Sequence, residues 1–570
     1  MDKIKRTLSF NESCTKKLRT NEFNKTINSL SSIETFPNEI FYEIFDYLNG
    51  CDIYSAFSNL NYRFQQFFNS SSFLLKIKFY FISNHLFLNN YKHKILSLNL
   101  WPAFYINDFF SWFIIDSSFD RLESIILPRI KQKTLLLVLK KLIYLPRLFS
   151  LSIEFYDTCD VYQSIFTLPM LKYLKVTSLE YHTSLSLPIA INNQQLNTIK
   201  ILIINHSCTF NELATILSYT HQLTHLNFMH FSGNDSNIEM ILSITLSNLI
   251  YISMNVIFLE FDKIEMFMKK ISSKLKILRF STRSQDQSYL LSNRWEEFIL
   301  QHLPYLEKFY FTYNINIDYQ DELIDFPWQS DLFISPFWIA RKWIFEGQIE
   351  DEESSFLIKP YKKRWYEFIN VDRKSNMKPA TLLSVQYIPF YEYVDDLLDQ
   401  IFCIRSITSI YHLEFCQTEI FIGSLMRIIR MLPNLDSLKI WSVLLPQSTC
   451  LSIKDRKFLR HIKYTNKITK VYLEKNLTKF EEVLFIIDLF PRMKYLQVSC
   501  TSFINIQLFI QAILIKIRNK SKRYHRLLAF CISTASDEMV KTLQKMIDCQ
   551  KLLFNYTIKR VYDTIYLQWK

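Results

Sequence analysis

One apolar pattern recurs along most of this chain and restricts the folds that it can adopt. Each copy reads apolar, two variable residues, apolar, one variable residue, apolar, and successive copies lie about 23 to 34 residues apart within an unbroken run. A period of that length is typical of repeat arrays, in which no unit can bury its apolar face alone and each packs on its neighbours. The sequence therefore predicts an elongated stack of similar units. The first apolar residues of the copies are Ile95, Leu122, Leu148, Leu171, Ile199, Leu223, Leu249, Leu275, Leu306, Ile410, Leu435, Ile468, Met493 and Leu527.

Five copies share a longer form that shows where each unit turns. They read LPRLFSLSI from residue 145, LPMLKYLKV from 168, LPYLEKFYF from 303, LPNLDSLKI from 432 and FPRMKYLQV from 490. Proline cannot continue a helix and biases the residue before it toward extended backbone, so it predicts the end of a helix. The residues that follow alternate apolar and polar, as a strand with one buried face does. We expect a helix before each strand, for example over residues 238–246 and 424–431.

This pattern resembles the leucine-rich repeat. The resemblance covers most of residues 90–570 and is degenerate, because the asparagine of the family's ladder stands only at Asn314 and Asn476. It implies an α/β fold, a curved solenoid with one helix and one strand in each unit, over residues 90–314 and 401–570. The missing ladder asparagines predict turns that are less regular than those of a typical member.

Residues 315–400 break the period and are rich in aromatic residues. An acidic cluster at 350–353 and a basic cluster at 362–364 flank a possible hairpin. A long insertion in a repeat array often projects from one face and binds a partner. The alternative is an enlarged unit with a buried aromatic core, and the sequence leaves both open. Four of the nine tryptophans lie in this insertion: Trp328, Trp338, Trp343 and Trp365.

The segment of residues 36–67, FPNEIFYEIFDYLNGCDIYSAFSNLNYRFQQF, predicts three short helices. Pro37 suits the first helical position, and Glu39 lies in the first turn, where the helix dipole favours a carboxylate. An apolar stripe at helical spacing follows, and Gly50 is expected to end this helix in the left-handed conformation. Asp52 is expected to cap the second helix, and a third helix carries clustered phenylalanines. The apolar positions are Ile40, Ile44, Phe45, Leu48, Ile53, Ala56, Phe57, Leu60, Phe64, Phe67 and Phe68.

Three such helices bury little surface, so the unit gains stability by docking against other protein. The run F-P-N-E-I, followed by I-F-x-Y-L and D-I, is similar to the F-box motif, with Phe36 and Ile53 in place of the usual leucines. The resemblance implies an F-box over residues 33–80 that docks on the Skp-type linker subunit of a Skp–cullin–F-box ubiquitin ligase. By the same resemblance the contacting residues would be Phe36, Pro37, Ile40, Ile44, Phe45 and Leu48.

Together the two resemblances imply a non-catalytic substrate receptor, a three-helix F-box followed by a curved leucine-rich-repeat-like α/β solenoid. The linker would connect it to a cullin, the repeats would hold a protein substrate, and other subunits would transfer ubiquitin to that substrate. One alternative is an interaction scaffold without a ligase role, in which the three helices only cap the array. A weaker alternative is a nucleic-acid-binding solenoid that uses basic runs such as residues 516–526.

The repeat phase predicts which side chains face the concave surface. The second and fourth residues after each first apolar residue should lie there, because side chains alternate along a strand. Five of these positions are basic, and only one is acidic, Glu414. We expect this surface to bind an acidic or phosphorylated segment, with Lys and Arg as donors and Tyr as walls. The basic and aromatic positions are Lys175, Arg279, Lys308, Lys439, Lys470, Tyr173, Tyr251, Tyr310, Tyr472 and Tyr495.

Glycine usage excludes many nucleotide-dependent enzymes. The chain has four glycines, and no two are close enough to form a loop whose backbone N–H groups cradle a phosphate. No G-x-S-x-G or HExxH motif is present, so we expect no enzyme activity and no cofactor. His206, Cys208, His221 and His225 only partly match the spacing of a zinc finger, and we expect no metal.

The remaining features concern location. Residues 1–32 are polar and basic, which predicts a disordered tail, and Lys5-Arg6 with residues 16–19 resembles a nuclear import signal. Residues 241–259 lack charge, but their Ser, Thr and Asn content and repeat phase favour a buried helix and strand over a membrane span. No two of the ten cysteines form a CxxC pair, and the net charge is +13. We expect a protein of the cytoplasm or nucleus, with no membrane partner.

Overall fold

The computed structural model describes most of the chain beyond the N-terminal tail. The predicted tail and import signal, the helix expected over residues 238–246, Trp328 and most of the basic run at 516–526 lie wholly or largely outside it. The described residues are 36–78, 89–101, 106, 109–110, 113–156, 161–178, 197–232, 246–271, 274–315, 333–350, 353–365, 367, 381–386, 394–416, 419–444, 453–477, 481–500, 505–518, 526–532 and 535–569.

The three predicted N-terminal helices are present: α1 (Asn38–Asp46), α2 (Gly50–Phe57) and α3 (Tyr62–Asn69). Their core is aromatic, because each short helix has few positions and phenylalanine fills the most volume at each. The Phe41 ring meets the Phe64 ring edge-on, with ring centroids 5.0 Å apart. The Asn61 side chain accepts a hydrogen bond from the Phe64 backbone N–H and so caps α3.

The prediction that Gly50 ends the first helix is wrong. The structure ends α1 at Asp46 and begins α2 at Gly50, and no described glycine has a positive φ. A Cβ at Gly50 would lie 2.6 Å from Ile77 Cδ1 and 3.2 Å from Leu75 Cβ. Glycine is therefore required because α2 packs closely on the next strand, and a left-handed turn is not the reason.

That strand, β1 (Leu75–Lys78), joins the helical unit to the sheet. The Asn49 amide holds both the N–H and the carbonyl of Lys78, at 2.8 and 2.9 Å. Asn49, and not the predicted Asp52, occupies the cap position of α2. A second link comes from Lys94, just before β2. Its buried ammonium donates to the carbonyl oxygens of Phe68 and Ser70 at the end of α3.

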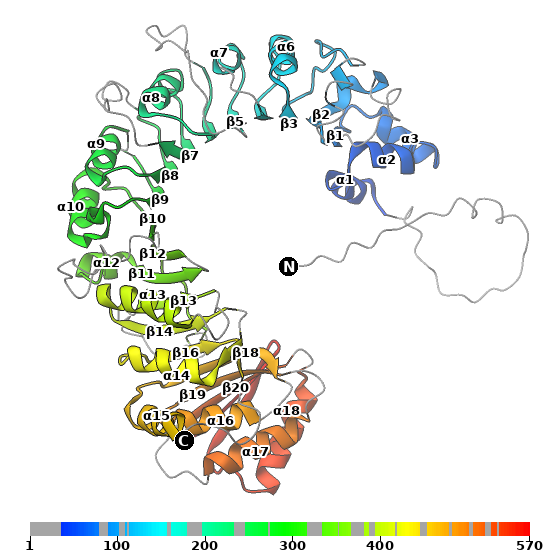
Figure 1. Cartoon of the computed structure of the whole chain (residues 1–570). Coiled ribbons are helices and arrows are strands. Elements are labelled where there is room, and N and C mark those ends of the chain that lie inside the picture. The colour runs from blue at the N-terminus through cyan, green and yellow to red at the C-terminus, as the bar shows by residue number, and fades with distance from the viewer. Residues whose placement is uncertain are drawn as a thin grey trace, which may run out of the picture.

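The first half of the sheet runs in chain order. Strands β1 to β10 pair in sequence, and every pair is parallel. Figure 1 shows these strands along the inner side of an arc and the helices along its outer side. The further elements are β2 (Ile95–Asn99), β3 (Ser124–Ile130), α6 (Gln132–Leu142), β4 (Ser150–Phe155), α7 (Tyr162–Ile165), β5 (Tyr173–Ser178), β6 (Ile201–Asn205), α8 (Phe210–Ser218), β7 (His225–Ser232), β8 (Tyr251–Ile257), α9 (Phe261–Ile271), β9 (Ile277–Arg283), α10 (Ser292–His302) and β10 (Lys308–Ile315).

The insertion forms part of the same sheet. It contains a hairpin of β11 (Trp343–Glu350) and β12 (Glu353–Pro360), and β12 also pairs antiparallel with β10. The acidic cluster lies at the turn of this hairpin and does not flank it as was predicted. β13 (Thr381–Val385) then pairs with β11 and restores the parallel order. Trp338, on α12 (Pro336–Arg341), and Trp343 are buried beneath the hairpin. Of the two possibilities left open, the described part of the insertion fits the enlarged unit with an aromatic core.

The second half continues the parallel order from β13 through β14, β16, β18, β19 and β20, and β22 and β21 close it as an antiparallel pair. A separate pair, β15 and β17, lies beside it. The bounds are α13 (Val394–Ile407), β14 (Ile410–Phe415), β15 (Glu419–Phe421), α14 (Ile422–Met431), β16 (Ser437–Ile440), β17 (Ser442–Leu444), α15 (Ile453–Thr465), β18 (Lys470–Leu477), α16 (Glu481–Leu489), β19 (Tyr495–Cys500), α17 (Ile506–Arg518), β20 (Arg526–Ile532), α18 (Asp537–Cys549), β21 (Tyr556–Val561) and β22 (Thr564–Trp569).

The protein is thus a mixed α/β fold with one large, mostly parallel sheet, which confirms the predicted class. The first apolar residue of each copy is buried at every position where the structure describes its side chain, so at all of them except Leu527. Along β4, β5 and β8 buried residues alternate with partly exposed ones. The apolar pattern therefore forms the layer between strands and helices, as the period indicates.

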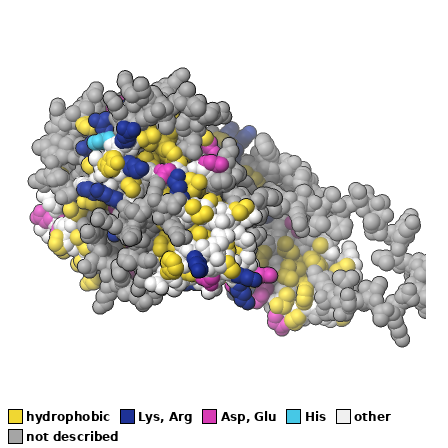
Figure 2. All heavy atoms as spheres, turned by 90° about the horizontal axis from the view of Figure 1, so that it is seen from below, with side chains coloured by type: hydrophobic (Ala, Val, Ile, Leu, Met, Phe, Trp, Pro, Cys, Tyr) yellow, Lys and Arg dark blue, Asp and Glu magenta, His cyan; other side chains and the backbone are white. Residues whose placement is uncertain are grey.

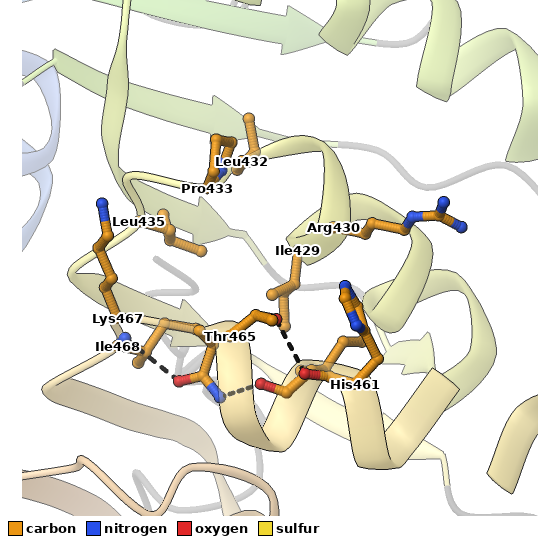
Figure 3. Close-up of a pocket in the computed structure, with 11 residues that line it drawn as sticks. Ile429, Arg430, Leu432, Pro433, Leu435, His461, Thr465, Lys467 and Ile468 are labelled. Atoms are coloured by element: carbon orange, nitrogen blue, oxygen red, sulfur yellow. Dashed lines mark hydrogen bonds between the residues drawn. The ribbon is translucent and has the colours of Figure 1, made fainter. Parts of the chain in front are cut away.

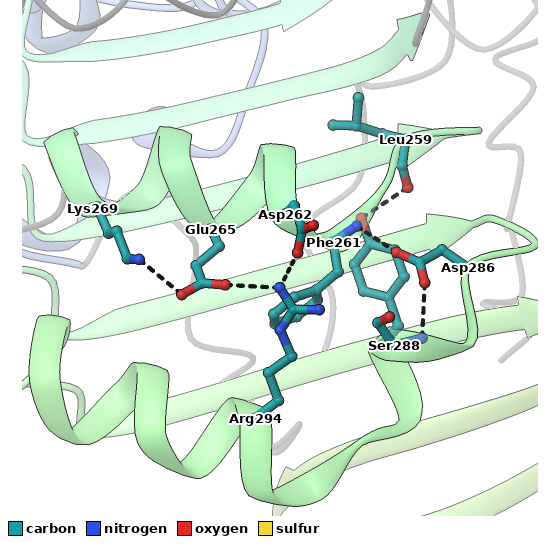
Figure 4. Close-up of polar contacts among 9 residues, drawn as sticks. Leu259, Phe261, Asp262, Glu265, Lys269, Asp286, Ser288 and Arg294 are labelled. Atoms are coloured by element: carbon teal, nitrogen blue, oxygen red, sulfur yellow. Dashed lines mark hydrogen bonds and ion pairs between the residues drawn. The ribbon is translucent and has the colours of Figure 1, made fainter.

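Neighbouring helices are also tied together on the outer side. Arg294 of α10 donates to Asp262 and to Glu265 of α9, the latter at 3.0 Å, and Glu265 also pairs with Lys269 at 2.9 Å (Figure 4). The Asp286 carboxylate accepts from the backbone N–H of Phe261 at 2.6 Å and so caps α9. Because the side chains of Arg294 and Glu265 are partly withdrawn from water, their contact adds to the apolar packing between consecutive units.

Residues 241–259 contain a strand, as expected. Leu246 is buried and β8 occupies residues 251–257. None of the helices in the described part of the chain combines the length and the apolar character that a membrane crossing needs.

Candidate functional site

One face of α1 presents an apolar stripe to solvent. Phe36, Ile40, Ile44 and Leu48 recur every four residues and are each between 36% and 40% exposed. They lie on the outside because α1 uses Phe41 and Phe45, on the opposite face, to pack on the helical core. The helix is apolar on both faces, and only the face with Phe41 and Phe45 is buried within this unit. The stripe therefore offers a surface on which another protein can dock.

Two predicted linker contacts lie differently from the stripe. Phe45 is only 5% exposed, and its ring packs on the rings of Phe57 at 5.1 Å and Phe73 at 5.7 Å. It shapes the unit from inside and is not on the surface. Pro37 is exposed and occupies the residue before α1, with extended backbone, one position earlier than predicted.

Arg63 of α3 fixes the start of the stripe, and sequence reasoning missed it. Its guanidinium donates to the Phe36 carbonyl at 2.5 Å and to the Asn38 side chain at 2.6 and 3.0 Å. The same group lies 5.2 Å from the centre of the Phe41 ring. These contacts fix the residues before α1 on the helical unit, so Phe36 stays in line with Ile40.

The second candidate surface is the inner face of the sheet between β5 and β10. Arg279 on β9 stands directly opposite Tyr310 on β10, with its guanidinium 4.3 Å from the ring centre. Lys308 is exposed two residues before Tyr310 on the same strand. Tyr173 and Lys175 lie on β5, four strands away, which corresponds to about 19 Å. The structure thus brings Arg279, Lys308 and Tyr310 together and leaves the β5 pair apart from them.

The strands between these two groups carry aromatic side chains on the same face. His225 on β7 stacks on Tyr251 on β8, with ring centroids 5.5 Å apart. Tyr251 is among the predicted positions. His225 occupies the equivalent position of its own strand, but it is neither Lys, Arg nor Tyr and was not predicted. Of the described residues, none forms an ion pair with Lys175, Arg279 or Lys308.

The inner face of the second half is neutralised by the chain itself. Lys439 pairs with Glu474 at 2.9 Å, and Lys470 pairs with Asp436. Burial raises the pKa of Glu414, which lies opposite Lys439, although the ammonium of Lys439 acts in the other direction. Burial alone would lower the pKa of Lys439, but its hydrogen bond to Glu474 and the negative charges of Glu474 and Glu414 together outweigh burial and raise this pKa. These two lysines are therefore partners of internal carboxylates.

Trp365 covers Tyr472 and Tyr495, the two tyrosines that were predicted to line the binding surface in the second half of the sheet. Its ring lies 5.5 Å from the ring of Tyr472 and 5.3 Å from the ring of Tyr495. Tyr495 is only 6% exposed. Trp365 follows β12 by five residues, so the insertion crosses the inner face to reach β18 and β19. In this half the expected binding surface is closed by the chain's own segment.

The histidine and cysteine cluster is explained by packing. His206 is buried, its Nε2 lies 2.7 Å from the Tyr162 hydroxyl, and its Nδ1 lies 2.9 Å from the Ser207 carbonyl. Burial lowers the pKa of His206, which favours the neutral ring. Across the described residues no group of three His, Cys, Asp or Glu side chains is arranged to hold a metal ion.

Comparisons with known proteins add no family to this description. No protein-family model matches the chain, and no curated protein matches its sequence. Two surfaces are therefore the candidate functional sites: the α1 stripe, which is apolar, and the inner face between β5 and β10, which is basic and aromatic.

Proposed function

We propose that this protein is a non-catalytic substrate receptor of a Skp–cullin–F-box ubiquitin ligase. Helices α1 to α3 act as the F-box, and the array of strands and helices acts as a leucine-rich-repeat-like solenoid that holds a protein substrate. The observation that carries the proposal is the α1 stripe, four exposed apolar side chains of which Ile40 and Ile44 lie on a helix whose other face is already buried, and Phe36 and Leu48 lie just beyond its two ends. Like other receptors of this class, the protein would act in the cytoplasm or nucleus.

The stripe has the geometry of helix-in-groove recognition. Ile40, Ile44 and Leu48 recur at every fourth residue, so they form one continuous ridge that fits a hydrophobic groove. Glu39 and Glu43 are exposed on the same helix and add negative charge beside the ridge. We expect the linker to present an apolar groove with a basic edge.

The attachment of the three helices to the sheet supports an adaptor role. Asn49 bonds both backbone groups of Lys78, Lys94 bonds the end of α3, and Gly50 packs against β1. A linker bound to α1 is therefore held at a fixed position relative to the inner face. A receptor that works by proximity needs such a fixed relation, because the substrate must be held near the enzyme that modifies it.

We further propose that the substrate binds the inner face between β5 and β10. Lys175, Arg279 and Lys308 carry positive charge and have no carboxylate partner among the residues that the structure describes, and Tyr173 and Tyr310 flank them. Charge-assisted hydrogen bonds from Arg and Lys favour a phosphorylated or acidic segment. Lys439, Lys470, Tyr472 and Tyr495 are left out of this surface, because they contact internal carboxylates or Trp365.

A pull-down with purified linker subunit tests the ligase role. Wild type should retain the linker, and the double variant Ile44→Asp with Leu48→Asp should not, because it places two carboxylates in the apolar contact. The matched control is Leu137→Asp with Ile143→Asp, which alters two exposed aliphatic side chains at α6. We expect this control to bind like wild type.

Two results would contradict the proposal. Wild type that retains no linker would favour the scaffold alternative, in which α1 to α3 only cap the array by packing on β1. Equal retention by wild type and the stripe variant would show that the contact lies elsewhere.

A further inference from the structure

The ends of the helices share one edge of the array. Since successive strands are parallel, the helix that connects two strands runs back along the sheet and ends at the edge where the next strand begins. We call this edge the helix-end rim. It comprises the last four residues of a helix and the turn up to the next strand. We consider nine of these connections, in which all residues except 272–273 belong to the described part of the chain: 139–149, 162–172, 215–224, 268–276, 299–307, 404–409, 428–436, 462–469 and 486–494.

The helix-end rim is strongly basic. The nine connections named above hold fourteen Lys or Arg residues against three Asp or Glu residues, compared with 67 against 54 in the whole chain. The opposite edge differs, because carboxylates stand in the first turns of α8, α9, α16 and α18. The array is therefore polarised across its width.

The helix dipole explains only half of this charge. Cations in the last turn of a helix are stabilised by its dipole, and this effect falls off within one turn. Seven of the fourteen basic residues lie beyond the helices, in the turns. All seven are exposed: Arg147, Lys172, Lys274, Lys276, Lys467, Arg492 and Lys494.

The three carboxylates of the rim are already engaged. Glu307 pairs with Lys276 at 2.8 Å, Asp436 pairs with Lys470, and Asp488 pairs with Lys516 at 2.8 Å. Lys269 is also paired, with Glu265 of its own helix at 2.9 Å. The cations still outnumber the carboxylates, so the rim has a net positive charge that attracts an acidic partner.

A cavity of about 130 Å³ opens on this rim between the ends of α14 and α15 (Figure 3). Its floor is aliphatic and includes Ile429, Leu432 and Ile468, whereas Arg430 and Lys467 stand at its edge. No carboxylate is among the residues that line it. Its size is comparable to that of an apolar cavity of about 150 Å³ that holds benzene, so it can receive one aliphatic side chain.

The backbone at the end of α15 does not compete for the cations of this cavity. The Thr465 hydroxyl donates to the His461 carbonyl at 2.9 Å. The Asn466 amide donates to the Ile462 carbonyl at 2.5 Å and accepts from the Ile468 N–H at 3.3 Å. The Lys467 ammonium donates to the Asn434 side-chain oxygen at 3.2 Å, a neutral acceptor that leaves the positive charge of Lys467 uncompensated.

We propose that the helix-end rim binds an extended acidic segment of a partner protein, which inserts one aliphatic side chain into the cavity between α14 and α15. Charge complementarity selects the acidic segment, and the aliphatic floor selects a protein over nucleic acid. Single-stranded nucleic acids need flat aromatic surfaces on which several bases stack, and the lining of this cavity has no Phe, Tyr or Trp and only one aromatic ring, that of His461. On the face of the molecule that Figure 2 shows from below, Lys and Arg side chains are interspersed with hydrophobic ones.

Fluorescence anisotropy with the full-length chain tests this proposal. The probe is a labelled peptide of about 20 Glu and Ser residues with one central Leu, and a second peptide replaces this Leu with Ser. Wild type should bind the first peptide about tenfold more tightly than the second, because only the first fills the cavity. An oligothymidylate of equal charge should bind more weakly than the first peptide.

Matched variants separate the rim from general charge effects. Arg430→Glu with Lys467→Glu should weaken binding of the first peptide by about tenfold or more, since it reverses two charges beside the cavity. Lys131→Glu with Lys133→Glu makes the same change at the opposite edge and should have little effect. Arg430→Gln with Lys467→Gln, a milder change, should give an intermediate loss.

Three results would overturn the proposal. They are equal effects of the two charge-reversal variants, equal affinity for the two peptides, and tighter binding of the oligothymidylate than of the first peptide. The α1 stripe is not altered in any of these variants, so each result is independent of linker docking.

Discussion

Gly50→Ala is expected to loosen the three-helix unit from the sheet. The added Cβ would lie 2.6 Å from Ile77 Cδ1 and 3.2 Å from Leu75 Cβ, and real side chains essentially never approach as closely as the first distance. Overpacking of this kind costs about 1–3 kcal/mol. Alanine recovers up to about 1 kcal/mol through its better helix propensity and the lower entropy of the unfolded chain. The net loss should therefore lie between about 0 and 3 kcal/mol.

Ile77→Val provides a test of the cause, because it removes the Cδ1 atom that the new Cβ would meet. In this background Gly50→Ala should be close to neutral, so the two substitutions should couple by about 1–2 kcal/mol in a double-mutant cycle. A chain of this length does not unfold in one step, so a global midpoint is not a suitable measure. Hydrogen exchange of the α1 to α3 amides reports the local opening instead, with about tenfold faster exchange for each 1.4 kcal/mol lost.

Gly423→Ala is the matched control. A Cβ at Gly423, in the first turn of α14, meets nothing within 4 Å. The same substitution should there slow exchange of α14, by an amount that corresponds to at most about 1 kcal/mol. Slower exchange of α2 in Gly50→Ala, or no rescue by Ile77→Val, would refute the close-packing explanation.

Two further predictions concern contacts that hold the array together. Trp365→Ala should remove two aromatic contacts, each worth about 0.5–1.5 kcal/mol, and hydroxyl-radical footprinting should then show greater oxidation of Tyr472 and Tyr495. Unchanged oxidation of both tyrosines would contradict the covering role of Trp365. Burial acts to raise the pKa of Glu265, but its bonds to Lys269 and Arg294 outweigh burial and lower it. A lowered carboxyl pKa in the folded state stabilises the protein above the unfolded pKa of about 4.3, and this stability is lost as pH falls through the folded value. Hydrogen exchange of the α9 and α10 amides, corrected for intrinsic rates, should therefore become faster on acidification in wild type. The acceleration should be smaller in Arg294→Met, and equal pH dependence of the two proteins would contradict a stabilising role of the Glu265–Arg294 pair.

The strands could be placed from the sequence because their signal is local. Each first apolar residue is buried wherever its side chain is described, and strands begin within two residues of it. The enlarged unit was harder to place, since its hairpin pairs with β10 as well as within itself, and pairing between distant segments leaves no periodic trace.

The candidate site was predicted unevenly for a similar reason. The apolar stripe of α1 follows from helical spacing, but spacing alone grouped Phe45 with it, and only the packing of α3 and of the residues before β1 shows that Phe45 is buried. Glu474 was missed because it lies six residues after Ile468, beyond the two positions considered in each strand.

The sequence by itself determined the class of the fold, the order of its strands and the presence of an amphipathic helical unit before them. These follow from the periodicity of apolar side chains, which depends only on near neighbours in the chain. The tertiary structure decided which charged side chains face outward toward a partner and which form ion pairs within the chain. It closed the second half of the inner face with Trp365, and it gathered helix ends that lie 23 or more residues apart into one basic rim. Such outcomes depend on where distant segments meet, and no local pattern records that.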